Sequence, residues 1–141
     1  MLEVIKSVTG SESNLIANLA NICSIIQENK NYHWTGFYLV EGEELVLGPF
    51  QGPLACTRIA FGKGVCGSAW SEKKTQRVDD VHKFSGHIAC SVKTNSELVV
   101  PILKDGIVVA VLDLDSTSFS AFTESDQDNF EEIAKYIATL F

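Results

Sequence analysis

The chain has 141 residues, of which 45% are hydrophobic, and this is enough to bury the core of one compact domain spanning residues 1–141. Eleven basic residues against eighteen acidic ones give a formal net charge of −7, and the lysines and arginines are scattered along the sequence. Because a surface that follows phosphates needs clustered positive charge, this balance argues against nucleic acid as a partner.

The amino-terminal segment lacks the features of a secretion signal. Residues 1–10 read MLEVIKSVTG, include the acidic Glu3 and contain no run of about seven or more apolar residues. No later stretch approaches the length of a membrane span. We therefore expect a cytoplasmic protein with no membrane partner, in which the four cysteines are reduced at rest and any disulfide is transient and functional.

The first half of the chain predicts a helix, a β-hairpin and a second, shorter helix. From Ser11 to Asn29 apolar residues recur at helical spacing, and Cys23 lies on the apolar face. Two strand-like runs follow, HWTGFYLV and ELVLGPF, separated by the turn-prone residues at 41–43. Residues 54–74 then predict a strand, a glycine-rich loop and a short helix over Val65 to Ser71.

The second half predicts another hairpin and a closing helix. The β-branched runs at 96–103 and 107–115 flank an Asp-Gly turn, and we expect them to be two central strands. Thr123 and Asp126 resemble a capping box, and apolar residues follow at helical spacing. This order of elements predicts an α+β domain, with an antiparallel sheet covered by the terminal helices on one face.

The cysteines differ in their surroundings. Cys23, on an amphipathic stripe, is expected to be an inert small hydrophobe. Cys56, Cys66 and Cys90 lie beside glycines or in loops, where reactive atoms are exposed. Their separations do not match the Cys-x-x-Cys pairs of structural zinc sites, which disfavours a zinc protein. His87, three residues before Cys90, is placed to favour its thiolate, which is the nucleophilic form.

Three carboxylates leave two interpretations open. Strand alternation puts Asp113 and Asp115 on one face with Val109 and Val111. They are either the solvated end of a strand or part of a pocket that binds an ammonium group or keeps one acid protonated, because like charges held close raise one pKa. Glu97, at the start of another apolar run, is either a charged strand start or a third carboxylate of that pocket.

The aromatic and glycine patterns also have competing explanations. Trp34 and Tyr38 share one strand face, either as core aromatics or as the wall of a ligand site. The spacing of Gly62, Gly64 and Gly67 matches the dinucleotide motif G-x-G-x-x-G. No parallel βαβ unit follows, so we reject a dinucleotide site and expect no cofactor.

A series of segments, taken in order, carries a family resemblance. These segments are WTGFYLV, ELVLGPFQGPLAC, FGKGVCGSA, DDVHKFSGHIAC, SELVVPI and VAVLDLDS. Together they resemble the free methionine-R-sulfoxide reductases, enzymes built on a GAF domain, over nearly the whole chain. A generic GAF sensor domain shares the fold and lacks the three cysteines at 56, 66 and 90.

The resemblance implies a GAF domain with a central antiparallel sheet of about six strands, and a ligand pocket on the face opposite the terminal helices. It implies that Cys90 is the catalytic cysteine, that Cys56 is its resolving partner, and that Cys66 is a third cysteine of variable role. The substrate-binding residues that it implies are Trp34, Tyr38, Glu97, Asp113 and Asp115. Ser91 stands where the family usually has Asp, a change that bears on the thiolate pKa of Cys90 and on substrate contacts.

The expected reaction is reduction of free methionine-R-sulfoxide. The Cys90 thiolate attacks the sulfoxide sulfur, an acid (Glu97 first) protonates the departing oxygen, and Cys56 condenses with the resulting sulfenic acid to form a disulfide. The expected partners are the substrate, thioredoxin as reductant and a second copy of the chain in a homodimer, with no metal. The main alternative is a non-catalytic GAF module that senses a small molecule or redox state.

Overall fold

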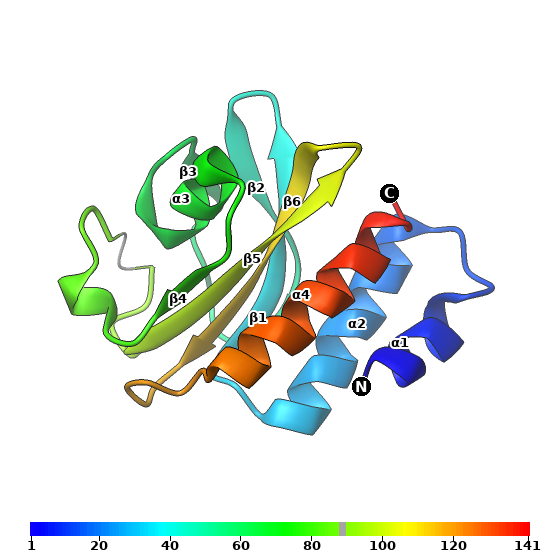
Figure 1. Cartoon of the computed structure of the whole chain (residues 1–141), viewed down its shortest axis with the longest axis horizontal. Coiled ribbons are helices and arrows are strands. Elements are labelled where there is room, and N and C mark those ends of the chain that lie inside the picture. The colour runs from blue at the N-terminus through cyan, green and yellow to red at the C-terminus, as the bar shows by residue number, and fades with distance from the viewer. Residues whose placement is uncertain (88–89) are drawn as a thin grey trace.

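A six-stranded antiparallel sheet forms the centre of the computed structural model, which describes residues 1–87 and 90–141 (Figure 1). The strand order is β3-β2-β1-β6-β5-β4. The elements in chain order are α1 (Leu2–Thr9), α2 (Leu15–Lys30), β1 (Trp34–Glu41), β2 (Glu44–Gln51), β3 (Arg58–Ala60), α3 (Gly64–Glu72), β4 (Gln76–Val78), the 3₁₀ turn η1 (Val81–Lys83), β5 (Ser96–Lys104), β6 (Ile107–Ser116) and α4 (Glu124–Ala138).

The helices divide between the two faces of the sheet. Helices α2 and α4 lie side by side on one face with α1 beside them, whereas α3 lies on the opposite face (Figure 1). Among the helices of the described part of the chain, none has the length and apolar character needed to cross a membrane. The predicted α+β class, with terminal helices on one face, is confirmed.

Local capping sets the ends of the two predicted long helices. Helix α2 begins at Leu15, four residues later than expected, because the Asn14 side chain accepts a hydrogen bond from the Ala17 backbone N–H. Helix α4 begins after Thr123, whose hydroxyl accepts from the Asp126 N–H while the Asp126 carboxylate accepts from the Thr123 N–H. The predicted capping box is therefore confirmed, with Asp in place of the usual Glu.

Both predicted hairpins are present. In the β5–β6 hairpin, Asp105 and Gly106 adopt φ of 53° and 77°, as a two-residue turn between twisted strands requires. Strand β6 lies beside β1 at the centre of the sheet. Strand β5 is one position further out, next to the three-residue β4, so the expectation of two central strands is correct for β6 and wrong for β5.

The side-chain alternation in β6 is interrupted near its start. The pairing with β5 steps from Ala110 to Val108, so Val109 forms a β-bulge. Val108 consequently packs on the same face as Val111, and Val109 packs against the helix-side core. The predicted faces are correct from residue 110 to residue 115 and wrong for Val108 and Val109.

Candidate active site

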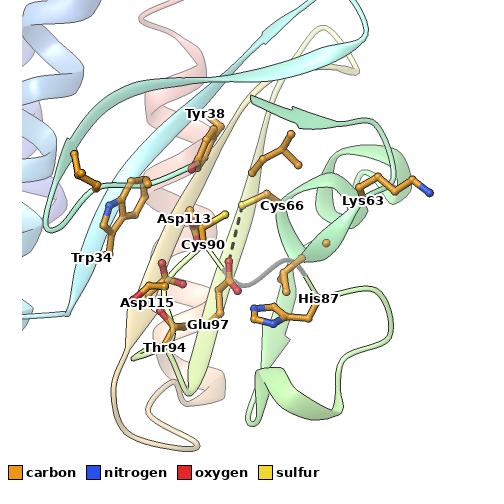
Figure 2. A pocket seen from close by; sticks show the side chains of 16 residues that line it. Trp34, Tyr38, Lys63, Cys66, His87, Cys90, Thr94, Glu97, Asp113 and Asp115 are labelled. Carbon is orange, nitrogen blue, oxygen red and sulfur yellow. Dashed lines mark hydrogen bonds between the residues drawn. The ribbon is translucent and has the colours of Figure 1, made fainter. Parts of the chain in front are cut away.

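A cavity opens on the face of the sheet opposite α2 and α4, between β1, β5, β6, α3 and the segment that carries Cys90 (Figure 2). Seven of the eight predicted site residues line it, and these are Trp34, Tyr38, Cys66, Cys90, Glu97, Asp113 and Asp115. The eighth, Cys56, is joined to the cavity through its disulfide with Cys90. The structure thus gathers in one place residues that lie up to 81 positions apart (34 to 115) in the sequence.

The disulfide links two connecting segments. Cys56 precedes β3 and Cys90 precedes β5, and their Cα atoms lie 5.4 Å apart. The Tyr38 hydroxyl donates a hydrogen bond of 2.9 Å to the Cys56 carbonyl, which ties this segment to the cavity wall. The pairing implied by the family resemblance is therefore present in the structure.

Cys23 lies on the far side of the sheet. It is 1% exposed within the core under α2, and its thiol donates to the Pro49 carbonyl at 3.3 Å. Burial raises its pKa to about 12, so the reactive thiolate is scarce at neutral pH. This agrees with the interpretation of Cys23 as an inert hydrophobe.

Cys66 lies in the short helix predicted over Val65 to Ser71, observed as α3, but it is buried, contrary to the exposure expected from its glycine neighbours. It belongs to the first turn of α3, is 4% exposed and faces the acids of the sheet. Burial raises the pKa of its thiol, and the negative charges of Asp113 and Glu97 raise it further. Cys66 is therefore held as a neutral thiol, a weak nucleophile, with its Sγ 3.9 Å from Glu97 Oε1.

The three carboxylates form the floor of the cavity. Glu97 on β5 is the direct cross-strand partner of Asp115 on β6, and Asp113 lies two residues further along the same face. Glu97 and Asp113 are 6% and 5% exposed, so the interpretation as a solvated strand end is wrong for them. No ion pair joins any of the three within the described residues.

This burial keeps the acids partly protonated. Burial raises the pKa of Glu97 well above its usual value, and the charge of Asp113 adds to the effect. Burial raises the pKa of Asp115 as well, again with a contribution from Asp113, and raises that of Asp113 to about 6. The site therefore combines at least one acid able to donate a proton with others able to hold a positive charge.

The wall of the cavity is aromatic. The rings of Trp34 and Tyr38 stack with centroids 5.9 Å apart, and Trp34 also stacks on Phe50 at 5.2 Å. The Trp34 indole donates to the Pro53 carbonyl at 3.1 Å, which fixes its orientation. The two rings are thus both core residues and cavity lining, and the two interpretations of the sequence do not exclude each other.

His87, which lines the cavity together with Cys90, does not supply the positive charge that would favour a thiolate. Burial lowers the pKa of His87, with a smaller contribution from His82, so its imidazole is neutral at neutral pH and supplies no cation for a thiolate. Ser91, the residue that departs from the family pattern, forms a 3.3 Å hydrogen bond with His33 Nε2. That bond connects the Cys90 segment to the residue just before β1.

Sequence reasoning missed several cavity residues, which are Leu54, Ala55, Ile59, Lys63, Gly64, Val65 and Thr94. Gly64 and Val65 adjoin Cys66 in the motif FGKGVCGSA, so the motif offered a signal for them. Leu54 lies in the segment ELVLGPFQGPLAC, which offered a similar signal, whereas Ile59 and Thr94 lie outside the quoted segments and only the fold reveals their place.

Comparison with known proteins places these features in a wider group. Residues 14–141 match the family model of the GAF domain. The chain is 44% identical over 128 residues to the free methionine-R-sulfoxide reductase of Escherichia coli (strain K12), covering 90% of this chain and 78% of that protein. It is 50% identical over 138 residues to GAF domain-containing protein A of Dictyostelium discoideum, covering 97% and 87%. The solved structure of free methionine-R-sulfoxide reductase from Neisseria meningitidis in complex with its substrate matches with a TM-score of 0.98 at 48% identity, covering 99% and 85%.

Proposed function

We propose that this chain, which belongs to the GAF domain family and within it to the free methionine-R-sulfoxide reductases, reduces free methionine-R-sulfoxide to methionine. The observation that carries the proposal is the Cys56–Cys90 disulfide beside a cavity whose floor consists of buried acids. A thiolate that becomes a sulfenic acid supplies the two electrons, a second thiol closes the disulfide, and an oxygen that leaves as hydroxyl needs a proton; this site offers all three groups.

The cavity suits a free amino acid better than a side chain within a polypeptide. We assign Asp113 and Asp115 on its floor as the acids that bind the substrate ammonium group, and a pKa of about 6 leaves Asp113 mostly ionised at neutral pH. Gly64 and Val65, which carry the first N–H groups of α3, line the same cavity, and no side chain caps this end of the helix. Free N–H groups at a helix start favour an anion, here the substrate carboxylate.

The reaction that we assign to the site balances in two steps. The Cys90 thiolate attacks the sulfoxide sulfur, the S–O oxygen passes to Cys90 with a proton from Glu97, and methionine leaves with its sulfur reduced by two electrons. Cys90 is then a sulfenic acid, and the Cys56 thiol attacks it, releasing water and forming the disulfide. Trp34 and Tyr38 shape the wall against which the substrate's methyl and sulfur lie.

Thioredoxin is the reductant that we propose for the disulfide. Its dithiol restores both cysteines by thiol–disulfide exchange, a reaction suited to a reducing compartment, and on this ground we propose a cytoplasmic location. We also propose that residues 1–141 fold as one domain, since Ile5 of α1 is fully buried in the same core as α2 and α4. The homodimer stays a prediction.

A thioredoxin-coupled assay tests the proposed function. With thioredoxin, its reductase and NADPH, we expect NADPH consumption with the R epimer of free methionine sulfoxide and little with the S epimer. A non-catalytic sensor, the alternative function, would bind methionine sulfoxide without turnover. NADPH consumption at background level with both epimers would therefore overturn the proposal.

Replacing Cys56 with serine separates the two chemical steps. Since attack by Cys90 precedes disulfide formation, Cys56→Ser is expected to release about one methionine per chain and then stall. Quantifying methionine in a single-turnover experiment measures this burst. Cys23→Ser is the control, because Cys23 lies on the other side of the sheet and should leave turnover unchanged. Full steady-state turnover by Cys56→Ser would move the resolving role to Cys66.

A further inference from the structure

We propose that the floor of the cavity is also a zinc site, formed by the Cys66 thiolate and the carboxylates of Glu97 and Asp113, and that zinc bound there excludes the substrate. The metal site rests on the geometry of these three residues. The exclusion of substrate rests in addition on the proposed function, because it assumes that the same acids hold the substrate ammonium group.

The three ligand atoms are close to the spacing that zinc requires. One ligand atom each from Cys66, Glu97 and Asp113 all lie within 4.8 Å of one another, and Cys66 Sγ is 3.9 Å from Glu97 Oε1. Zn–S and Zn–O bonds of about 2.3 Å and 2.0 Å place tetrahedral ligands about 3.5 Å apart. The residues come from α3, β5 and β6, which are regular elements packed together, so only small side-chain movements are needed.

An unsatisfied atom points to a missing positive partner. Asp113 is 5% exposed, and its Oδ1 is buried without a hydrogen-bond partner. Glu97 and Cys66, both nearly fully buried, face it across the cavity floor (Figure 2). Lys63, a basic residue of the cavity lining, extends its side chain away from these acids (Figure 2). A divalent cation would offset the repulsion among the acids and satisfy the free oxygen.

The donor set favours zinc over the common hard cations. Magnesium and calcium prefer oxygen ligands, whereas a thiolate with two carboxylates suits zinc and leaves a fourth position for water. Cys66 loses its proton on binding, because only the thiolate is a ligand. This site is unlike the structural zinc site that the cysteine spacing disfavours, since a single cysteine takes part.

Cobalt binding to the oxidised protein provides the test. With the Cys56–Cys90 disulfide intact, Cys66 and Cys23 are the free cysteines of the described chain. Adding Co²⁺ is expected to produce a thiolate-to-cobalt charge-transfer absorption that Zn²⁺ displaces. Cys66→Ser should abolish the band. Asp113→Asn should weaken Co²⁺ binding at least about tenfold, because even mutation of a residue that only hydrogen-bonds to a metal ligand lowers metal affinity about 10- to 100-fold.

A control variant tests whether Cys66 is the thiol that binds Co²⁺, and a competition experiment tests whether the metal and the substrate exclude each other. Cys23→Ser removes the other free thiol, on the opposite face of the sheet, and should leave the band unchanged. Free methionine sulfoxide should raise the apparent dissociation constant of Co²⁺ in proportion to its concentration. Absence of the band in the unmodified chain, or its persistence in Cys66→Ser, would overturn the site. Because the band is measured without turnover, a chain that shows it and has no reductase activity would retain the site and lose only the proposed function.

Discussion

Replacing Cys90 with serine is expected to abolish reduction of free methionine sulfoxide, with a loss of at least roughly four orders of magnitude in kcat/KM. The hydroxyl of serine cannot take up the sulfoxide oxygen at neutral pH, and neither Cys66 nor Cys23 can substitute for Cys90. Cys66 is held as a neutral thiol by burial and by the acids, and Cys23 lies on the far side of the sheet. Methionine release in a single-turnover reaction, started from the reduced protein, measures the effect.

This prediction differs from that for Cys56→Ser in its pre-steady-state phase. Cys90→Ser should show no burst of methionine, whereas Cys56→Ser should show one equivalent. Far-ultraviolet circular dichroism and thermal unfolding should show that both variants remain folded, because neither cysteine is in the buried core. A burst from folded Cys90→Ser would transfer the nucleophilic role to another cysteine.

Sequence periodicity and turn motifs predicted the helices and strands whose patterns lie within one short stretch of the chain. The two hairpins followed from alternating runs around tight turns, and the capping box of α4 followed from Thr123 and Asp126. Helix α1 and strand β4 were missed because eight and three residues hold too few repeats of either period. The bulge at Val109 was invisible as well, because a one-residue insertion is defined only by the partner strand.

The sequence predicted which residues form the site but not how deeply they are buried. The three acids could be suspected from strand alternation and from the family resemblance, but their burial depends on α3 closing over β5 and β6. The same closure buries Cys66, which its glycine-rich neighbours had suggested to be exposed. The partner of Cys90 came from the resemblance, since sequence separation does not determine which cysteines pair.

Glu97→Gln is expected to lower kcat about 100- to 10,000-fold while changing KM little, since glutamine keeps the shape of the side chain and loses the proton that the departing oxygen requires. Asp113→Asn should act mainly on KM, raising it about 10- to 100-fold through loss of a charged contact to the substrate ammonium group. Steady-state kinetics of both variants with free methionine-R-sulfoxide separate the two roles. The control is Asp126→Asn on the helix side of the sheet, which should leave both parameters unchanged.

The pH dependence follows from the raised pKa values. An acid that donates a proton is active in its protonated form, so kcat is expected to fall as the pH rises through the raised pKa of Glu97, and Glu97→Gln should lose this descending limb.

The same shifts affect stability. The folded state binds the Asp113 proton more tightly than the unfolded state, so this group's contribution to stability declines between pH 3.8 and about 6 and stays low above that. Asp113→Asn should therefore be at least as stable as the unmodified chain at pH 7, which thermal unfolding can measure.

The kinetic predictions for the acids have one contradicting outcome. If Glu97→Gln and Asp113→Asn are both folded and keep wild-type kinetics and an unchanged pH profile, the acids neither bind the substrate nor protonate its oxygen.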